Sequence, residues 1–104
     1  MKLEVGMYVR IKWGIGKIKR IYDEKYKGRI SVATNKTAYG MEEKDILKAS
    51  HNIIDLIEVG DYVNGEKVYQ ENGHLFVGNW WIENKNIKSI VTKEQFESAQ
   101  YKVD

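Results

Sequence analysis

The stretch Glu4-Val5-Gly6-Met7-Tyr8-Val9 returns 54 residues later as Glu58-Val59-Gly60-Asp61-Tyr62-Val63, with five of the six residues identical. A second echo follows in the same order, because Asp45-Ile46-Leu47-Lys48-Ala49-Ser50 is loosely matched by Asn86-Ile87-Lys88-Ser89-Ile90-Val91. Segments that recur in the same order indicate a duplicated structural unit. The chain is therefore interpreted as two related halves.

The residues after the first copy have the pattern of short β-strands. Apolar and polar side chains alternate through Met7–Trp13, which is the period of a half-buried strand. Gly14 and Gly16 permit a tight reversal or a close approach of backbones, and a slip in phase indicates a bulge near Lys19 in the strand Ile15–Tyr22. The rest of the first half is expected to contain a loop at Asp23–Gly28, a strand at Arg29–Thr34, a loop at Asn35–Gly40, a helical turn at Glu42–Asp45 and a strand at Ile46–Ser50.

The second half has clearer turn signals. Asn64-Gly65 favours a type I′ hairpin, which needs positive φ at both positions. Thr92-Lys93-Glu94-Gln95 fits a capping box and predicts a short helix near residues 93–99. The apolar segment His51–Ile57 is expected to be buried between the halves. Strands are predicted at Asp61–Val63, Lys67–Glu71, His74–Val77, Trp80–Glu83 and Ile87–Val91, with a last edge strand at Tyr101–Val103.

Five short strands and a helical turn in each half predict an all-β protein, with two tandem small SH3-like barrels packed together. Residues 1–50 form the first half, which is basic, and residues 51–104 form the second half, which is acidic. A barrel of about 50 residues is marginal alone, so the halves are expected to dock as one rigid body.

Two stretches resemble known proteins. Val5-Gly6-Met7-Tyr8-Val9-Arg10, followed by Gly14-Ile15-Gly16-Lys17-Ile18, resembles the opening of KOW- and Tudor-like barrels and the polymerase-binding module of the CarD family. That resemblance implies a fold rather than a partner, because Lys12-Trp13 replace the residues usual in that family. Residues 55–65 and 87–97 resemble uncharacterised small proteins of Firmicute phages and prophages, which implies an origin and no mechanism.

The composition argues against several classes of function. Cysteine is absent and the two histidines stand alone, so disulfides, thiol catalysis and a zinc site are not expected. No catalytic set or phosphate-binding loop is present either, and the protein is predicted to be neither an enzyme nor a binder of cofactors. Without a signal peptide or an apolar stretch of membrane length, the predicted location is the cytoplasm, away from membranes.

Charge divides unevenly between the halves, with 12 Lys/Arg against six Asp/Glu in the first and five against nine in the second. This division indicates an anionic partner for the first half, or attraction between the halves or between copies. One face of the first two strands combines cations with aromatic rings, as protein surfaces that bind nucleic acid do. A solvated strand face with lysine-rich edges has the same pattern. The candidate nucleic-acid residues are Tyr8, Arg10, Lys12, Lys17, Lys19, Arg20 and Arg29.

The three tryptophans are candidate protein-interface residues. Neighbours on a strand point to opposite faces, so one of Trp80 and Trp81 should enter the core and the other should face outward. The outward indole either anchors a partner or covers the seam between the halves. Trp13, beside the glycine turn, is interpreted as a lid on the core or as a ring that stacks on a ligand.

These features favour a non-catalytic accessory or adaptor protein of phage type that binds another macromolecule, with an unidentified protein as the expected partner. The alternative is a nucleic-acid-binding module that uses the basic face of the first half. A homo-oligomer is a third hypothesis, because oppositely charged halves or unpaired strand edges of two copies could associate.

Overall fold

A computed structural model describes residues 2–22 and 29–99 of the chain. Its first half contains β1 (Tyr8–Ile11), β2 (Gly14–Ile21), β3 (Ile30–Ala33), β4 (Ala38–Met41), the 3-10 helix η2 (Glu43–Asp45) and β5 (Lys48–Ser50). The 3-10 helix η3 (Ile53–Leu56) leads into the second half. There follow β6 (Tyr62–Val63), β7 (Glu66–Glu71), β8 (His74–Val77), β9 (Trp80–Trp81), the 3-10 helix η4 (Asn84–Asn86), β10 (Ile90–Val91) and α1 (Lys93–Ala99).

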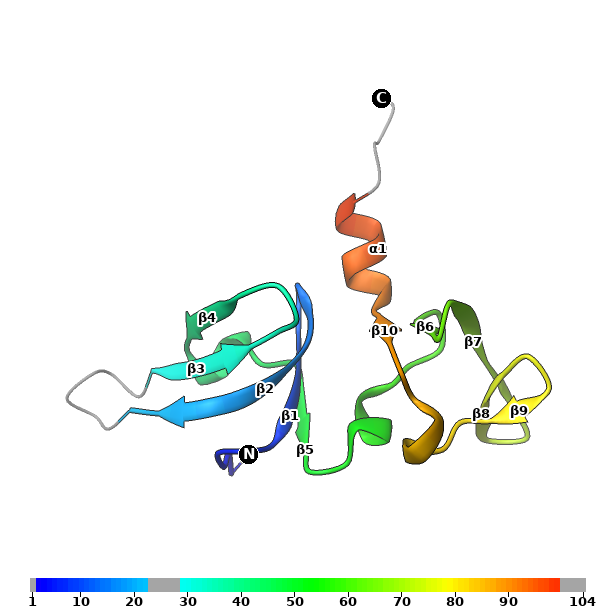
Figure 1. The fold of residues 1–104 in the computed structure, drawn as a ribbon, viewed down its shortest axis with the longest axis horizontal. Coiled ribbons are helices and arrows are strands. Elements are labelled where there is room, and N and C mark those ends of the chain that lie inside the picture. The colour runs from blue at the N-terminus through cyan, green and yellow to red at the C-terminus, as the bar shows by residue number, and fades with distance from the viewer. Residues whose placement is uncertain (1, 23–28, 100–104) are drawn as a thin grey trace.

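The strands form two antiparallel five-stranded sheets, one in each half (Figure 1). The first sheet has the order β4-β3-β2-β1-β5, and the second, read in the same direction, has the order β9-β8-β7-β6-β10. In each half a meander of four strands is followed by a 3-10 turn and a fifth strand that returns to pair with the first strand. The two sheets therefore share one strand order, and the predicted all-β class with a short C-terminal helix is confirmed.

The two copies of the repeated motif occupy equivalent places. Gly6 and Gly60 have φ values of 93° and 97°, a left-handed conformation that glycine adopts without strain. The amide of Gly6 donates to the carbonyl of Ile18 at 2.8 Å, and the amide of Gly60 donates to the carbonyl of Val68 at 3.1 Å. Each glycine therefore ties the start of its half to the second strand of the same sheet, so the repeat is structural.

Most local predictions are confirmed. The register of β2 against β3 shifts between Ile18 and Arg20, which places the expected bulge at Lys19. Asn64 and Gly65 have φ values of 53° and 83°, as the predicted hairpin turn requires. The amide of Gln95 donates to Oγ1 of Thr92 at 3.2 Å, and the amide of Thr92 donates to Oε1 of Gln95 at 2.9 Å, so the capping box begins α1. No helix in the described ranges is both long and apolar enough to span a membrane.

The predicted loop at Asn35–Gly40 is wrong, because β4 begins at Ala38 and pairs with β3. Thr34 closes the turn before this strand by donating its amide to the carbonyl of Thr37 at 2.8 Å. Alternation of side chains does not reveal this strand, because Gly40 contributes no side chain to the pattern. The predictions for Asp23–Gly28 and Tyr101–Val103 lie outside the described residues.

The two cores differ in size. Eight buried residues fill the first half, namely Met7, Val9, Ile11, Ile18, Ile30, Val32, Met41 and Ile46. The second core has four buried residues among those described, Ile57, Val63, Val68 and Val77. Leu56 and Ile57 are buried and η3 packs against β1 and β5, so the end of the segment between the halves is buried as predicted. The smaller second core leaves large side chains of that half exposed.

Gly16 supplies the close approach that the glycine pair predicted. A Cβ atom at Gly16 would lie 2.5 Å from Cγ1 of Val32 and 2.9 Å from the carbonyl oxygen of Ala33. Gly16→Ala is therefore expected to lower the free energy of unfolding by about 1–3 kcal/mol, the usual cost of overpacking. Gly40→Ala is the matched control, because its nearest neighbour would be 3.9 Å away. Equal urea midpoints for the two variants would contradict this reading.

Candidate functional site

Arg10 joins the two halves, and its side chain has 0% exposure. Its guanidinium donates to the two carboxylate oxygens of Asp61 at 2.6 and 2.7 Å and to the carbonyl of Leu56 at 2.9 Å. It also donates to Glu94 at 2.5 and 3.3 Å. One side chain of the first half is thereby bonded to Asp61 and Glu94 of the second half and to Leu56 in the segment between the halves. This group is called the Arg10 junction.

Electrostatics keep both central groups of the junction charged. Burial alone would raise the pKa of Asp61, but hydrogen bonds from Arg10 and from the amides of Glu58 and Lys93 outweigh burial, and the pKa is lowered. Burial opposes the charge of Arg10 as well, yet hydrogen bonds to Asp61 and Glu94 raise its pKa above the ordinary value. The junction is therefore ionic at neutral pH.

A second ring of charges surrounds the junction at the surface. Nζ of Lys93 lies 2.9 Å from Glu58, and Nζ of Lys48 lies 3.4 Å from the same carboxylate. The hydrogen bond with Lys93 is the main reason that the pKa of Glu58 is lowered. Since Lys48 belongs to the first half and Glu58 to the second, the ring adds a further link between the halves.

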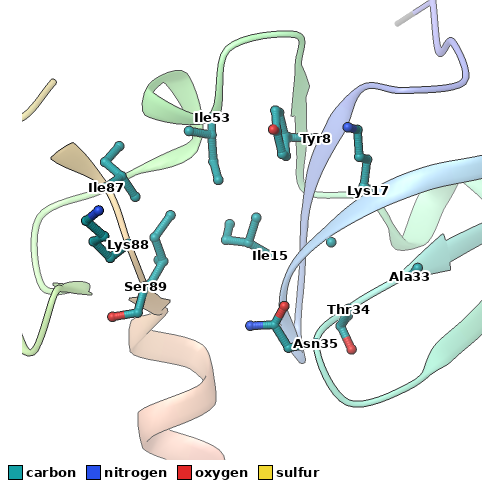
Figure 2. Close-up of a pocket in the computed structure, with 12 residues that line it drawn as sticks. Tyr8, Ile15, Lys17, Ala33, Thr34, Asn35, Ile53, Ile87, Lys88 and Ser89 are labelled. Carbon is teal, nitrogen blue, oxygen red and sulfur yellow. The ribbon is translucent and has the colours of Figure 1, made fainter. Parts of the chain in front are cut away.

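An open hollow of about 300 Å³ lies between the two halves (Figure 2). Tyr8 and Lys17 stand on the wall from the first half, while Lys88 and Ser89 stand on the opposite wall from the second half. Ile15 lies between the walls in this view. The residues that line the hollow are Tyr8, Ile15, Gly16, Lys17, Ala33, Thr34, Asn35, Ile53, Ile87, Lys88, Ser89 and Ile90.

The hollow continues into a second one that shares five of its lining residues. The extension adds Trp13, Tyr39 and Phe96, together with Lys36, to the surface. The rings of Trp13 and Tyr39 stack in parallel, with centroids 4.7 Å apart and planes at 8°. The two hollows together are called the interhalf groove.

The lining of the interhalf groove contains no carboxylate among the described residues, although the chain has 15 Asp and Glu. The charged side chains along it are Lys17, Lys36 and Lys88. A concave surface with charges of one sign concentrates ions of the opposite sign. The groove is therefore suited to an anionic ligand that is long enough to contact both halves.

Strand register explains why the cations and rings meet there. Tyr8 is opposite Lys17, and Lys17 is opposite Ala33, so all three share the outer face of the first sheet. Nζ of Lys17 lies 5.2 Å from the ring centroid of Tyr8. The bulge returns Arg20 to the same face opposite Ser31, farther along the strand. If β2 ran through Lys19 as a regular strand without the bulge, strict alternation would point Arg20 toward the core.

The predicted basic residues do not form one patch. Tyr8 and Lys17 line the groove, and Arg20 follows them on the same face with its guanidinium 5.9 Å from the ring of Tyr22. Lys12 lies in the turn after β1, with Nζ 4.4 Å from the ring of Trp13. The remaining two, Lys19 and Arg29, are exposed outside the groove lining.

The prediction that Arg10 belongs to an exposed face is wrong. The strand alternation was assigned correctly, because Arg10 lies on the face opposite the core residues Val9 and Ile11. That outer face is covered at this position by the second half. The repeat contained a signal that a cation would be buried against the second half. Asp61 stands where the first copy has the core residue Met7, and a buried carboxylate needs a partner.

The prediction that one of Trp80 and Trp81 enters the core is also wrong, and neither indole covers the seam between the halves. Their exposed fractions are 76% and 59%, and β9 is the outer edge strand of the second sheet, far from the first half in Figure 1. Trp13, predicted as a lid on the core, is 45% exposed and lines the groove.

Trp81 belongs to an aromatic cluster on the outer face of the second sheet. Register aligns Tyr69, Phe76 and Trp81 across three strands. Phe76 lies edge-to-face with Trp81 at 5.7 Å, and the ring of His74 stacks on Trp81 at 4.4 Å. Among the described residues no group of three or more His, Cys, Asp or Glu could hold a metal ion.

Removing the charge of Arg10 should lower the stability of the fold. Arg10→Met leaves Asp61 buried without its partner, and the free energy of unfolding is expected to fall by about 3–5 kcal/mol. Lys44→Met is the control, because the exposed pair between Lys44 and Glu42 should contribute less than about 1 kcal/mol. Urea unfolding monitored by circular dichroism measures both, and similar losses would contradict a special role for the junction.

The junction also predicts a response to acid. Because the folded pKa of Asp61 is lowered, its stabilising effect is complete above the ordinary carboxyl value of about 3.9 and is lost as pH falls below it. Asp61→Asn should therefore flatten the fall in melting temperature between about pH 5 and 2. Glu97→Gln, at an exposed position of α1, is the control and should have the same dependence of melting temperature on pH as the native chain. If the native chain, Asp61→Asn and Glu97→Gln all lost melting temperature in parallel, Asp61 would not be the source of the response to acid.

Comparison with known proteins identifies no relative for this architecture. No protein-family model, curated protein or solved structure matches the chain. The resemblances to barrel families and to phage proteins therefore stay predictions.

Proposed function

We propose that this protein is a non-catalytic accessory protein, of the phage type that the sequence suggested, which binds single-stranded nucleic acid in the interhalf groove. The observation that supports this proposal is a groove that combines three lysines and several aromatic rings without a carboxylate in its described lining. Phosphate groups need cations, and unpaired bases need flat apolar surfaces. The groove offers both along one path.

The cations would act on the phosphate backbone. A lysine that neutralises a phosphate releases condensed counterions, which gives binding that weakens as salt rises. Lys17 and Lys88 belong to opposite halves, so one extended strand could contact both while it lies between them. Asn35 and Ser89 add a side-chain amide and a hydroxyl, which can hydrogen-bond to sugar or base.

The rings and the apolar lining favour a single strand over a duplex. Bases stack on protein rings only when they are unpaired, and such stacking depends little on base sequence. Trp13 and Tyr39 provide a partly exposed stacked pair, and Ile15 and Ile53 give the groove an apolar lining. The outside of a duplex presents mainly sugars and phosphates, which would leave these surfaces unused.

This proposal relocates the nucleic-acid hypothesis from the sequence. The expected surface belonged to the first half alone, whereas the interhalf groove takes Lys88, Ser89 and Phe96 from the second half. An adaptor that binds a protein is a second candidate function, favoured by the exposure of Trp80 and Trp81 away from the groove. The two functions are compatible because they use different surfaces.

Fluorescence anisotropy with labelled oligo-dT and oligo-rU of about twelve nucleotides tests the proposal. Each lysine–phosphate contact on a single strand contributes about −0.7 to the slope of log affinity against log salt. One contact therefore raises the affinity at about 50 mM salt by about eightfold relative to about 1 M salt. Lys17→Gln and Lys88→Gln should each weaken binding by about fivefold to tenfold. The double variant should reduce the salt slope by about 1.4.

Matched controls separate a groove from general attraction. Lys44→Gln and Lys85→Gln remove the same charge at exposed sites outside the groove lining and should change affinity by less than about twofold. Trp13→Ala should weaken binding by about fivefold or more, and Trp81→Ala should not. No binding at low salt, equal effects of groove and control lysines, or tighter binding of a duplex of the same length would overturn the proposal.

A further inference from the structure

A separate hollow, of about 270 Å³, lies on the second half beside Trp80 and is called the Trp80 pocket. Val63, Val77, Ile82 and Ile87 give it an apolar lining. The indole of Trp80, at 76% exposure, is the most exposed large hydrophobic side chain in the described ranges. Tryptophan is enriched among the residues that contribute most of the binding energy at protein interfaces.

The charge of this pocket is opposite to that of the groove. Glu66 and Glu83 line it, and no Lys or Arg does among the described residues. Glu83 has an exposed ion pair with Lys85 at 3.5 Å, whereas Glu66 forms no ion pair with any described residue. An indole face next to a free carboxylate attracts a cation through two independent interactions.

The pocket is held open by side-chain hydrogen bonds rather than left to loop motion. Nδ2 of Asn64 donates to the carbonyl of Asn86 at 2.7 Å. Oδ1 of Asn64 accepts the amides of Lys88 and Ser89 at 2.7 and 3.1 Å. These bonds fix the turn before β7 to the segment before β10, so two walls of the Trp80 pocket are positioned before any ligand arrives.

We infer that the Trp80 pocket binds an arginine side chain from an extended basic segment of a protein partner. The guanidinium can stack on the indole of Trp80 while it donates to Glu66, and its aliphatic stem can cover Val77 and Ile82. Arginine suits this geometry better than lysine because its group is planar and less strongly hydrated. This inference rests on the second candidate function and is independent of the interhalf groove.

Titration of the labelled full-length chain with a short peptide tests the inference by following the three indole N–H signals in proton–nitrogen NMR spectra. The probe is Ac-Gly-Ser-Arg-Ser-Arg-Ser-Gly-amide, and the controls carry Gln or Glu in place of both arginines. The arginine peptide should shift the signals of Trp80 and Trp81 and leave Trp13 unmoved. Trp80→Ala and Glu66→Gln should each weaken binding by about fivefold or more.

Glu71→Gln is the matched control, because it removes a carboxylate from the same strand outside the pocket lining. Equal shifts with the Gln or Glu peptide would overturn the basic partner while leaving a protein-docking site in place. No shift with any peptide would overturn both that inference and the pocket's role. If the Trp80 signal changed with protein concentration alone, a second copy of the chain would be the occupant, and the inference would also be wrong.

Discussion

The buried ion pair between Arg10 and Asp61 determines how the two halves sit together. Taking a guanidinium and a carboxylate out of water is costly, and the cost is offset only when geometry is good and every remaining donor is bonded. Arg10 meets this condition through Asp61, Glu94 and the carbonyl of Leu56. No buried side-chain nitrogen or oxygen in the described ranges lacks a partner. The relative placement of the halves, and with it the interhalf groove, depends on this arrangement.

The duplication explains where such a junction could arise. Two identical barrels would place an apolar residue at the position of Met7 in both copies, and the second copy has Asp61 there instead. This one difference within the motif supplies the carboxylate that the first half binds. The same docking brings the lysines of both halves to one groove, while the smaller second core leaves Trp80 exposed beside Glu66. One chain therefore presents a cationic groove and an acidic aromatic pocket, whose described linings share Ile87 alone.

Local chemistry made much of the fold predictable. The hairpin at Asn64-Gly65, the capping box at Thr92 and the bulge at Lys19 each follow from a few adjacent residues. The candidate site was less predictable, because alternation along a strand assigns Arg10 to the outer face without indicating what covers that face. The exposure of Trp80 was not predictable for the same reason, because it depends on how few apolar side chains pack against the second sheet. Long-range contacts, which no short pattern encodes, decided both outcomes.

If the Arg10 junction holds the halves in one arrangement, the distance between them should have a single value. The absence of cysteine allows two spin labels to be placed at Lys36→Cys and Lys67→Cys, one in each half, without other changes. Pulsed electron resonance then measures the distribution of distances between them. One narrow distribution is expected in the otherwise native chain. A broad one is expected when Arg10→Met is added, with strand content by circular dichroism retained. A broad distribution in the native chain, or an unchanged narrow one in the variant, would contradict this role of the junction.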